Sequence, residues 1–555
     1  MVHDIIASRV APLLLLSAAL AVVPPSRPAA AARSCPPLRE IRCFSLTVPL
    51  DRGGALPGTI RLRAARIRSR RPSRPPIVGL TGGPGQAGLP FADSYDAILP
   101  TAGRDLVMFD QRGTGGSGLL RCRGFERRLG SSLTTPAGSC GRSLGDRRSY
   151  YTSPDSADDL DALRARIRAD KIALYAVSYG TRVALEYARR YPQHVERMIL
   201  DSPVAPDGPD SLARETVGAV ARVVRSVCRS GCGAASTHPV ADLARLTRRL
   251  RRTPIRRLLR RGRHRVAVRV DADDVLSLLV SGDLDSDLLR AVPAAVKAAL
   301  SGRPGRLVRL KLDAIATEDG GLISEFSPAL FAATTCEESS FAWDRAGDTA
   351  TRRAQAQAAI GVTPEKALAP FDRTAAVRAG LLSLCEDWPA PGRAIAPAPP
   401  LSAPIPTLVL SGDLDLRTPL EKARALVAML PDAKLVVERG VGHGVLGADP
   451  NGCADPAVEA FLARRPLPAC RHDVSISVTA RRLGRSITRI DRSQLRPLRA
   501  PRAGGRVPRP RRSSARLVAV PRPAAAPAPR TSRRARPRAR RRACAARRGA
   551  ATAAS

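Results

Sequence analysis

Apolar and polar positions alternate most clearly in residues 171–203. Residues 172–177 are a short apolar run whose length suits a buried strand, and residues 197–200 are a second such run. Between them, residues 181–191 place apolar side chains at helical spacing, and a proline follows. The pattern predicts a strand, a helix and a second strand, with a sharp turn at Ser178 between the first two.

The same pattern of short apolar runs and helical spacing continues on both sides of this segment. Further short strands are expected at residues 43–50, 59–66, 77–80, 105–109, 407–410 and 434–437. Helical spacing is found at residues 156–168, 420–430 and 456–464. Strands that alternate with helices predict an α/β fold with a mostly parallel central sheet flanked by helices.

Residues 206–398 have a different pattern, because strand signals become rare there. Helices are expected at 216–227, 240–251, 271–279, 288–300 and 373–384, and a proline-rich stretch follows at 389–406. We therefore predict a largely helical cap over residues 206–398, inserted between two core segments at 33–205 and 399–474.

The first residues resemble a targeting segment. An apolar run at 11–23 is followed by the small residues Ala30, Ala31 and Ala32, which predicts a secretory signal peptide over residues 1–32. A retained N-terminal anchor is the alternative. No later stretch approaches 18 unbroken apolar residues, so the pattern argues against a membrane-spanning protein and for a secreted one.

Charge is concentrated at the other end. The 555 residues carry a formal net charge of +42, and about 24 arginines stand against one acidic residue between 481 and 548. Residues 475–555, rich in Arg, Pro and Ala, cannot bury enough apolar surface to fold, so we expect a disordered tail. The tail could bind nucleic acid or an anionic cell wall, or it could be an out-of-frame product of GC-rich DNA.

The cysteines fit an exported protein. Ten of the eleven fall into neighbouring pairs, and Cys544 is left over: Cys35 with Cys43, Cys122 with Cys140, Cys228 with Cys232, Cys336 with Cys385, and Cys453 with Cys470. Disulfides are expected in an oxidising compartment, although sequence does not fix their connectivity. A zinc site is disfavoured, because no C-x-x-C pair is present.

Three chemically capable residues each follow a predicted strand: Ser178, Asp415 and His443. Ser178 lies in Ala-Val-Ser-Tyr-Gly, close to the G-x-S-x-G turn that lifts a nucleophile above a sheet. The carboxyl ends of parallel strands meet at one edge, so the three should converge as nucleophile, acid and base. Asp413 competes with Asp415 as the acid and is otherwise a turn or capping residue. His472 is the weaker base candidate, because it lies beyond the last strand.

A glycine-rich loop follows the strand at 77–80. Residues 81–88 read Thr-Gly-Gly-Pro-Gly-Gln-Ala-Gly, with no Lys-Ser/Thr after them, so a phosphate-binding P-loop is excluded. Glycines there would instead let backbone N–H groups approach a developing oxyanion.

Five motifs stand in order along the chain: GGPG at 82–85, DQRGTGGS at 110–117, SYGT at 178–181, GDLDLRTP at 412–419 and GHG at 442–444. As a set they resemble the serine aminopeptidase branch of the α/β-hydrolases, over about residues 35–470. That branch includes proline iminopeptidases and secreted tripeptidyl aminopeptidase-like enzymes of actinobacteria. Thr81 stands where proline iminopeptidases usually have histidine, which favours the tripeptidyl type. Ala176 replaces the usual first glycine of the elbow.

The resemblance implies a role for each matching residue. Ser178, Asp415 and His443 would form the catalytic triad. Backbone N–H groups of Tyr179 and of Gly83 or Gly82 would form the oxyanion hole. Cleavage from a free N-terminus needs an acidic group near the cleft, and Glu337 and Glu338 in the cap are the candidates, unless they are simply solvated.

Other functions remain open at this point. An esterase of small acyl esters would use the same triad, and an inactive binding module with a basic tail is a candidate of another class. Ser178 at the elbow argues against dehalogenases and epoxide hydrolases, which need a carboxylate there. The expected partner is a peptide or small acyl substrate, and the sequence implies neither a metal nor an organic cofactor.

Overall fold

The computed structural model describes residues 41–470 except 102, 130–135, 206–207, 230–231, 233–235, 262–263, 319–323, 396–399 and 449–451. The predicted signal peptide, Cys35, His472, the tail and Cys544 lie outside the described residues.

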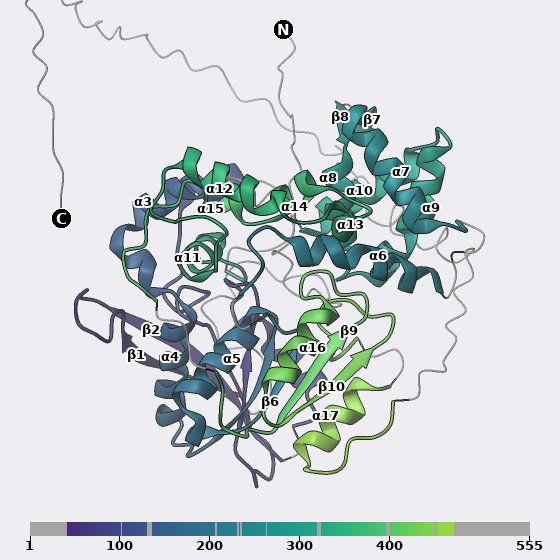
Figure 1. Ribbon diagram of the computed structural model, residues 1–555. Helices are drawn as coiled ribbons and strands as arrows, with labels where there is room; N and C mark the ends of the chain where they lie inside the picture. Colours follow the sequence, from purple (N-terminus) through teal and green to yellow (C-terminus); the bar gives the residue numbers. More distant parts are fainter. Residues whose placement is uncertain are drawn as a thin grey trace, which may run out of the picture. The chain divides into compact units, whose positions relative to one another are not determined.

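One eight-stranded sheet forms the centre of the fold (Figure 1). Its strands are, in spatial order, β1 (Ile41–Pro49), β2 (Thr59–Ile67), β4 (Leu106–Phe109), β3 (Ile77–Leu80), β5 (Ile172–Val177), β6 (Val195–Asp201), β9 (Thr407–Gly412) and β10 (Ala433–Glu438). β1 and β2 are antiparallel to each other, and β2 is antiparallel to β4, whereas all other neighbours are parallel. The predicted mostly parallel sheet is confirmed.

Helices cover both faces of this sheet. On one face pack α4 (Ser153–Arg166), α5 (Tyr179–Arg190) and α16 (Leu420–Met429), and on the other η2 (Leu89–Phe91), α1 (Ala92–Ile98) and α17 (Ala454–Leu462). Alternate residues of β5 point to opposite faces of the sheet. Leu174 packs against the face covered by α4, α5 and α16, and Ala173 and Tyr175 pack against the face covered by α1 and α17. Strands buried on both faces explain the continuous apolar runs in the sequence.

The chain between β6 and β9 is mainly helical. It contains α6 (Arg214–Arg229), α7 (Pro239–Arg252), α8 (Ala272–Ser281), α9 (Ser286–Leu300), α10 (Gly305–Glu318), α11 (Pro328–Glu338), α12 (Thr349–Gly361), α13 (Glu365–Leu368), α14 (Arg373–Ala379) and α15 (Leu382–Cys385). It also contains an antiparallel hairpin of β7 (Ile255–Arg261) and β8 (His264–Val270), which we did not predict. The valines at 266, 268 and 270 alternate with other residues and were the available signal.

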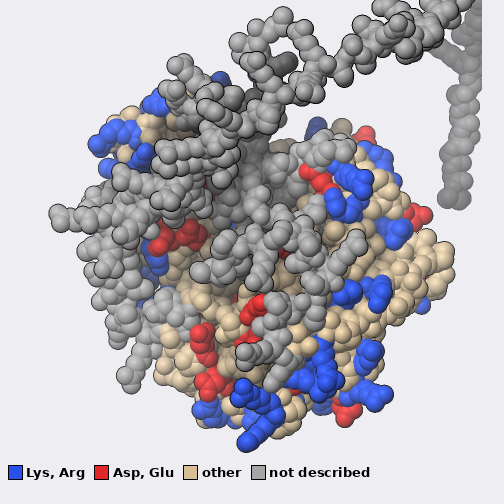
Figure 2. All heavy atoms as spheres, turned by 180° about the vertical axis from the view of Figure 1, so that it is seen from behind, with Lys and Arg blue, Asp and Glu red and all other residues tan. Residues whose placement is uncertain are grey.

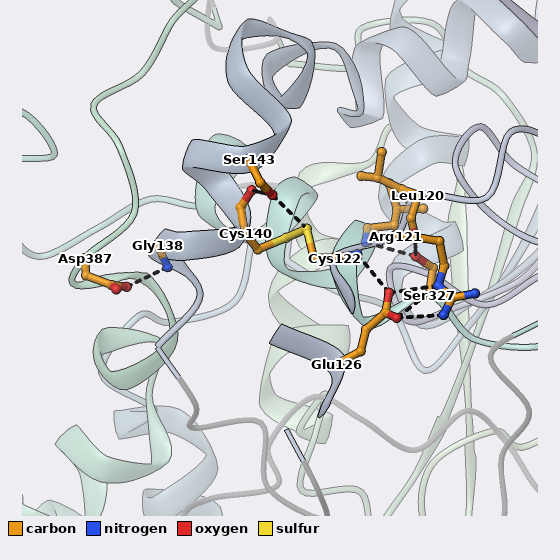
Figure 3. The surroundings of a disulfide bond; sticks show 10 residues. Leu120, Arg121, Cys122, Glu126, Gly138, Cys140, Ser143, Ser327 and Asp387 are labelled. Carbon is orange, nitrogen blue, oxygen red and sulfur yellow. Dashed lines mark hydrogen bonds and ion pairs between the residues drawn. A yellow bond between two sulfur atoms is a disulfide. The ribbon is translucent and has the colours of Figure 1, made fainter. Parts of the chain in front are cut away.

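A second segment packs against this cap, although it precedes β5 in the chain. It comprises α2 (Arg123–Leu129), α3 (Gly138–Leu144) and the 3₁₀ helix η3 (Gly145–Tyr150), all of which contact α11. A disulfide joins Cys122 to Cys140, and Ser327 at the start of α11 donates its hydroxyl to the carbonyl of Leu120 at 2.8 Å (Figure 3). Two separate parts of the sequence therefore pack together at the cap: the helices of residues 123–150 and the segment between β6 and β9.

Disulfides join cysteines that are neighbours in sequence, as the spacing suggested. They are Cys122–Cys140, Cys228–Cys232, Cys336–Cys385 and Cys453–Cys470. Cys43 is also disulfide-bonded. The bridge from Cys336 to Cys385 ties α11 to α15 inside the cap.

Charged side chains of both signs are interspersed over the described part of the face in Figure 2. Among the residues that the structure describes, no helix has the length and apolar content needed to cross a bilayer.

The DQRGTGGS motif, residues 110–117, contains an arginine that hydrogen-bonds to three separate segments of the chain. The guanidinium of Arg112 is buried and donates two hydrogen bonds of 2.7 Å to Asp159 on α4. It also donates to the carbonyls of Leu50 and Tyr150, at 3.1 and 2.7 Å. One side chain thereby joins the β1–β2 turn, η3 and α4 below the cap.

Asp159→Ala should destabilise the protein by about 3–5 kcal/mol, because Arg112 would keep a buried charge without its partner. Urea unfolding of the purified variant measures this. Asp287→Ala, which removes an exposed carboxylate that pairs with Arg290 in the described part of the chain, is the control and should change stability by less than about 0.5 kcal/mol. Equal effects in the two variants would contradict the assigned role of Asp159.

Candidate active site

Ser178 occupies the sharp turn between β5 and α5. Its backbone has φ 54° and ψ −124°, a left-handed region that a non-glycine residue adopts only under constraint. The turn is held from both sides: Ser178 N–H donates to Asp201 O at 3.0 Å, and Thr181 N–H donates to Ser178 O at 2.9 Å. A side chain at Gly180 would meet Leu80 O at 2.5 Å, so only glycine lets the helix start so close to β3. The predicted nucleophile-elbow geometry is present.

Ala176 is compatible with this turn. Its side chain is fully buried and packs in the apolar layer beneath α5, so the extra methyl group relative to glycine finds space in the core.

Asp415 and His443 meet in the loops after β9 and β10. His443 Nδ1 lies 3.0 Å from Asp415 Oδ2, and both side chains are buried. Asp415 Oδ1 accepts the N–H groups of Arg417 and Thr418 at 2.9 Å each, and Oδ2 accepts the Thr418 hydroxyl at 2.7 Å. These bonds fix the carboxylate and direct it at the imidazole.

The Asp413 side chain contacts other residues than the His443 imidazole. It accepts the N–H of Gly440 at 2.7 Å and lies 3.3 Å from the guanidinium of Arg229. Its position fits the turn and capping role that we allowed it, and it makes Asp415 the candidate acid.

Burial and the carboxylate act in opposite directions on His443. Burial disfavours the charged imidazolium, but Asp415 stabilises it and holds the pKa of His443 above its ordinary value. Conversely, burial would raise the pKa of Asp415, but His443 and the hydrogen bonds from Thr418 hold it below its usual range. The pair therefore favours an ionised acid beside a histidine that readily accepts a proton.

Ser178 and His443 line one pocket of about 1000 Å³, including the space open to solvent. Tyr179 and Gly83 lie in the same lining. The N–H of Tyr179 has no acceptor within α5, because it belongs to the first residue of that helix. Gly82 N–H donates to the side chain of Gln86 at 3.2 Å, which leaves Gly83 as the better candidate for a second oxyanion donor.

The pocket is formed between the sheet edge and the cap. The core supplies the loop after β6, with Pro203 and Val204, and the cap supplies residues of α6, α11 and α14. Both charge signs are represented in the lining, by Asp210, Glu215, Glu338, Arg182, Arg417 and Lys422.

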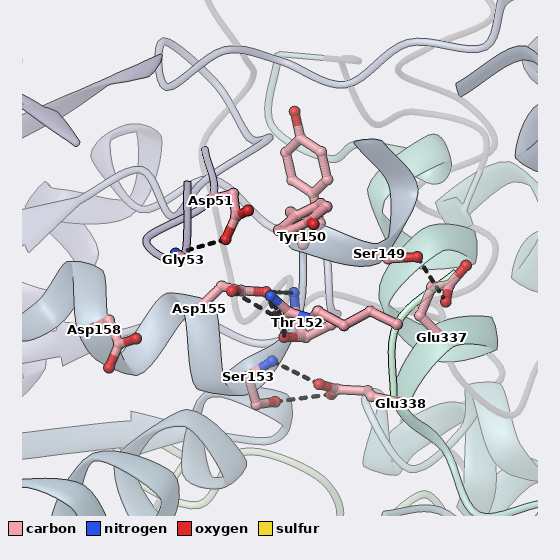
Figure 4. Close-up of polar contacts among 12 residues, drawn as sticks. Asp51, Gly53, Ser149, Tyr150, Thr152, Ser153, Asp155, Asp158, Glu337 and Glu338 are labelled. Atoms are coloured by element: carbon pink, nitrogen blue, oxygen red, sulfur yellow. Dashed lines mark hydrogen bonds and ion pairs between the residues drawn. The ribbon is translucent and has the colours of Figure 1, made fainter. Parts of the chain in front are cut away.

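The two candidate glutamates for binding an N-terminus separate in the structure (Figure 4). Glu337 does not line the pocket: it is buried, accepts the indole N–H of Trp388 at 2.8 Å and pairs with Arg148 at 2.9 Å. The prediction for Glu337 is thus wrong, because adjacent residues of a helix point about 100° apart.

Glu338 does line the pocket. Its carboxylate accepts the backbone N–H and the hydroxyl of Ser153 at 2.6 and 2.8 Å (Figure 4). The guanidinium of Arg182 lies 3.5 Å from the same carboxylate. The Glu338 side chain is 2% exposed and bound to Ser153, so the carboxyl group has a fixed position in the pocket wall.

Sequence reasoning missed Asp283, a buried cap residue just after α8. Its carboxylate accepts hydrogen bonds from the Asp415 loop, including Arg417 Nε at 2.8 Å. In sequence it is one of several aspartates near helix ends, and no local pattern distinguishes it from a capping residue.

Two family models match parts of this chain. A family model described as "alpha/beta hydrolase fold" matches residues 75–225, and one described as "TAP-like protein" matches residues 370–475. The two matches contain the Ser178 turn and the Asp415 and His443 loops, respectively. The α/β-hydrolase fold and the resemblance to the serine aminopeptidase branch are confirmed.

Named relatives are similar over part of their length. A tripeptidyl aminopeptidase of Streptomyces coelicolor is 31% identical over an alignment of 196 residues, which covers 30% of this chain and 36% of that protein. The serine protease Hip1 of Mycobacterium tuberculosis strain H37Rv is 29% identical over 188 residues, with the same coverage of 30% and 36%. A proline iminopeptidase of Lactobacillus helveticus is 28% identical over 138 residues, 25% of this chain and 38% of that protein. The match thus spans little more than a third of these relatives.

Asp415→Asn should lower the pKa of His443 from its raised position towards its ordinary value of about 6.5, because burial would then be opposed by Asp283 without the contribution of Asp415. In the unaltered protein the same histidine should lose its proton at a pH above that value. Nuclear magnetic resonance of protein labelled with ¹³C at histidine Cε1 follows both titrations. Asp413→Asn is the matched control and should leave the titration in place; an equal shift in both variants would contradict the assignment of Asp415.

Proposed function

We propose that this α/β-hydrolase is a secreted serine exopeptidase that releases residues or short peptides from free N-termini. The observation that carries the proposal is the convergence of Ser178 and the Asp415–His443 pair on one pocket beneath the cap. The chemistry follows from the triad and the specificity from the pocket.

In the proposed reaction, His443 removes the hydroxyl proton of Ser178 as the serine oxygen attacks the scissile carbonyl. Asp415 holds the imidazole by its Nδ1–H and stabilises the imidazolium that forms. The N–H groups of Tyr179 and Gly83 stabilise the oxyanion. His443 then donates its proton to the leaving amine. Water next attacks the acyl-enzyme while His443 takes its proton, and His443 returns that proton to the Ser178 oxygen as the acyl bond to the serine breaks and the acid product leaves.

A free N-terminus is the proposed recognition element, for two reasons. Relatives are named tripeptidyl aminopeptidase and proline iminopeptidase, and this chain resembles both. Glu338 supplies a buried carboxylate in the pocket wall to which a substrate ammonium group can be attracted. The surrounding cap residues limit the length of peptide that the pocket accepts.

The disulfide bonds support the part of the proposal that concerns export. The disulfides within residues 122–470 suit an oxidising compartment, which is where a signal peptide at residues 1–32 would direct the chain. The basic residues 475–555 would then retain the enzyme at an anionic cell wall.

Ser178→Ala should reduce kcat/KM for aminoacyl and tripeptidyl amides by about 10⁴-fold or more, because no acyl-enzyme can form. The measurement uses chromogenic amides with free and blocked N-termini, together with a short acyl ester. Turnover of the free-N-terminus amides alone supports an exopeptidase. Ester turnover that ignores the N-terminus would instead make the protein an esterase, and no Ser178-dependent turnover would leave a binding module.

Glu338→Gln should lower kcat/KM for free-N-terminus amides by about tenfold or more, since the neutral amide attracts an ammonium group less strongly. Hydrolysis of the blocked substrates and of the ester should change little. Glu337→Gln is the matched control on the adjacent position: it removes a charge from a buried network outside the pocket and should reduce thermal stability without changing the preference for a free N-terminus. Equal preference in Glu338→Gln and the unaltered enzyme would contradict the role of Glu338.

A further inference from the structure

Asp283 brings the cap into contact with the loops that carry the acid and the base. It lies between α8 and α9, and its side chain is 0% exposed. No step of the mechanism above uses it, although its buried carboxylate contacts the two residues that directly follow Asp415.

Its side chain holds the loop that contains Asp415. Asp283 Oδ2 accepts the N–H groups of Leu416 and Arg417 at 3.1 and 3.0 Å. The N–H of Arg417 also lies 2.9 Å from Asp415 Oδ1, so the two carboxylates share one donor. The peptide groups directly after the candidate acid are therefore fixed by a residue of the cap.

Its backbone holds the loop that contains His443. The N–H of His443 donates to Asp283 O at 2.8 Å. A side chain at the preceding residue, Gly442, would lie 1.8 Å from the same carbonyl oxygen. The base loop can approach the cap this closely only because glycine stands there.

Arg417 balances the charge of Asp283. Its Nε donates to Asp283 Oδ1 at 2.8 Å, and its Nη2 donates to Val280 O at the end of α8 at 3.1 Å. The charged groups that act on the Asp283 carboxylate are thus Arg417 and Asp415 from the acid loop and His443 from the base loop.

We propose that Asp283 is a positioning residue for the triad, which holds the Asp415 loop and the His443 loop together from the cap. The cap then completes the catalytic centre as well as covering the pocket. This inference rests on the proposed serine hydrolase function.

The negative charge of Asp283 also affects the pKa of His443. Burial raises the pKa of Asp283 to about 6, and in its ionised form the carboxylate raises the pKa of His443. Removal of that negative charge leaves Arg417 facing the imidazole and must lower the pKa of His443. The active, neutral form of the histidine would then persist to lower pH.

Asp283→Asn tests the proposal, with the rate at which a fluorophosphonate probe labels Ser178 as the readout. We expect labelling about tenfold or more slower at pH 8, and an acid-side midpoint lower by about half a pH unit or more. Asp285→Asn is the matched control, because Asp285 caps α9 two residues away and contacts neither loop through its side chain in the described contacts. It should lower stability but leave the rate and midpoint unchanged.

The probe separates failure of this inference from failure of the proposed function. Equal labelling of the unaltered protein and Ser178→Ala would overturn the serine hydrolase itself. Normal labelling of the unaltered protein, with the same rate and midpoint in Asp283→Asn, would overturn only the role of Asp283.

A conservative variant guards against simple misfolding. Asp283→Glu keeps the charge and should retain the acid-side midpoint within about 0.2 pH units, even if labelling slows. A shift as large as that of the Asn variant, or loss of folding in both variants by circular dichroism, would show that Asp283 only stabilises the fold and would overturn the proposal.

Discussion

Very close approach of backbone segments at the carboxyl edge of the sheet is the constraint on which the rest of the site depends. A side chain at Gly180 would collide with the carbonyl of Leu80, and one at Gly412 would lie 2.2 Å from the carbonyl of Gly442. Because these contacts are made by main-chain atoms, they fix the loops without relying on flexible side chains. The left-handed conformation of Ser178 persists because its surroundings leave no other path from β5 into α5.

Three buried carboxylates in and around the site each face a basic side chain. Asp415 faces His443, Asp283 faces Arg417, and Arg112 faces Asp159. Such pairs add little net stability compared with apolar residues, but the loss of one partner is costly. These pairs therefore specify the conformation of the loops that carry them. Each loop keeps its observed conformation only when the oppositely charged partner on the neighbouring segment is in place.

Among the polar contacts that connect the cap to the core, two sets next to the pocket come from cap residues far apart in sequence. Ser153, at the start of α4, donates two hydrogen bonds to Glu338 of α11, and Asp283 reaches the loops after β9 and β10. A cap held in this way affects both the shape of the pocket and the geometry of the groups beneath it. Substrate selection and the arrangement of the proposed catalytic groups thus depend on the same interface.

The sequence alone determined the mostly parallel sheet and the order Ser178, Asp415 and His443, because each is encoded by a local motif or spacing. It suggested disulfides between neighbouring cysteines, but their connectivity came from the structure. It did not reveal the β7–β8 hairpin, the burial of Glu337 or the position of Asp283. Which of two adjacent glutamates faces the pocket depends on the rotation of α11 in the cap. The contacts of Asp283 join residues more than 130 positions apart, and only the packing of the cap onto the core brings those segments together.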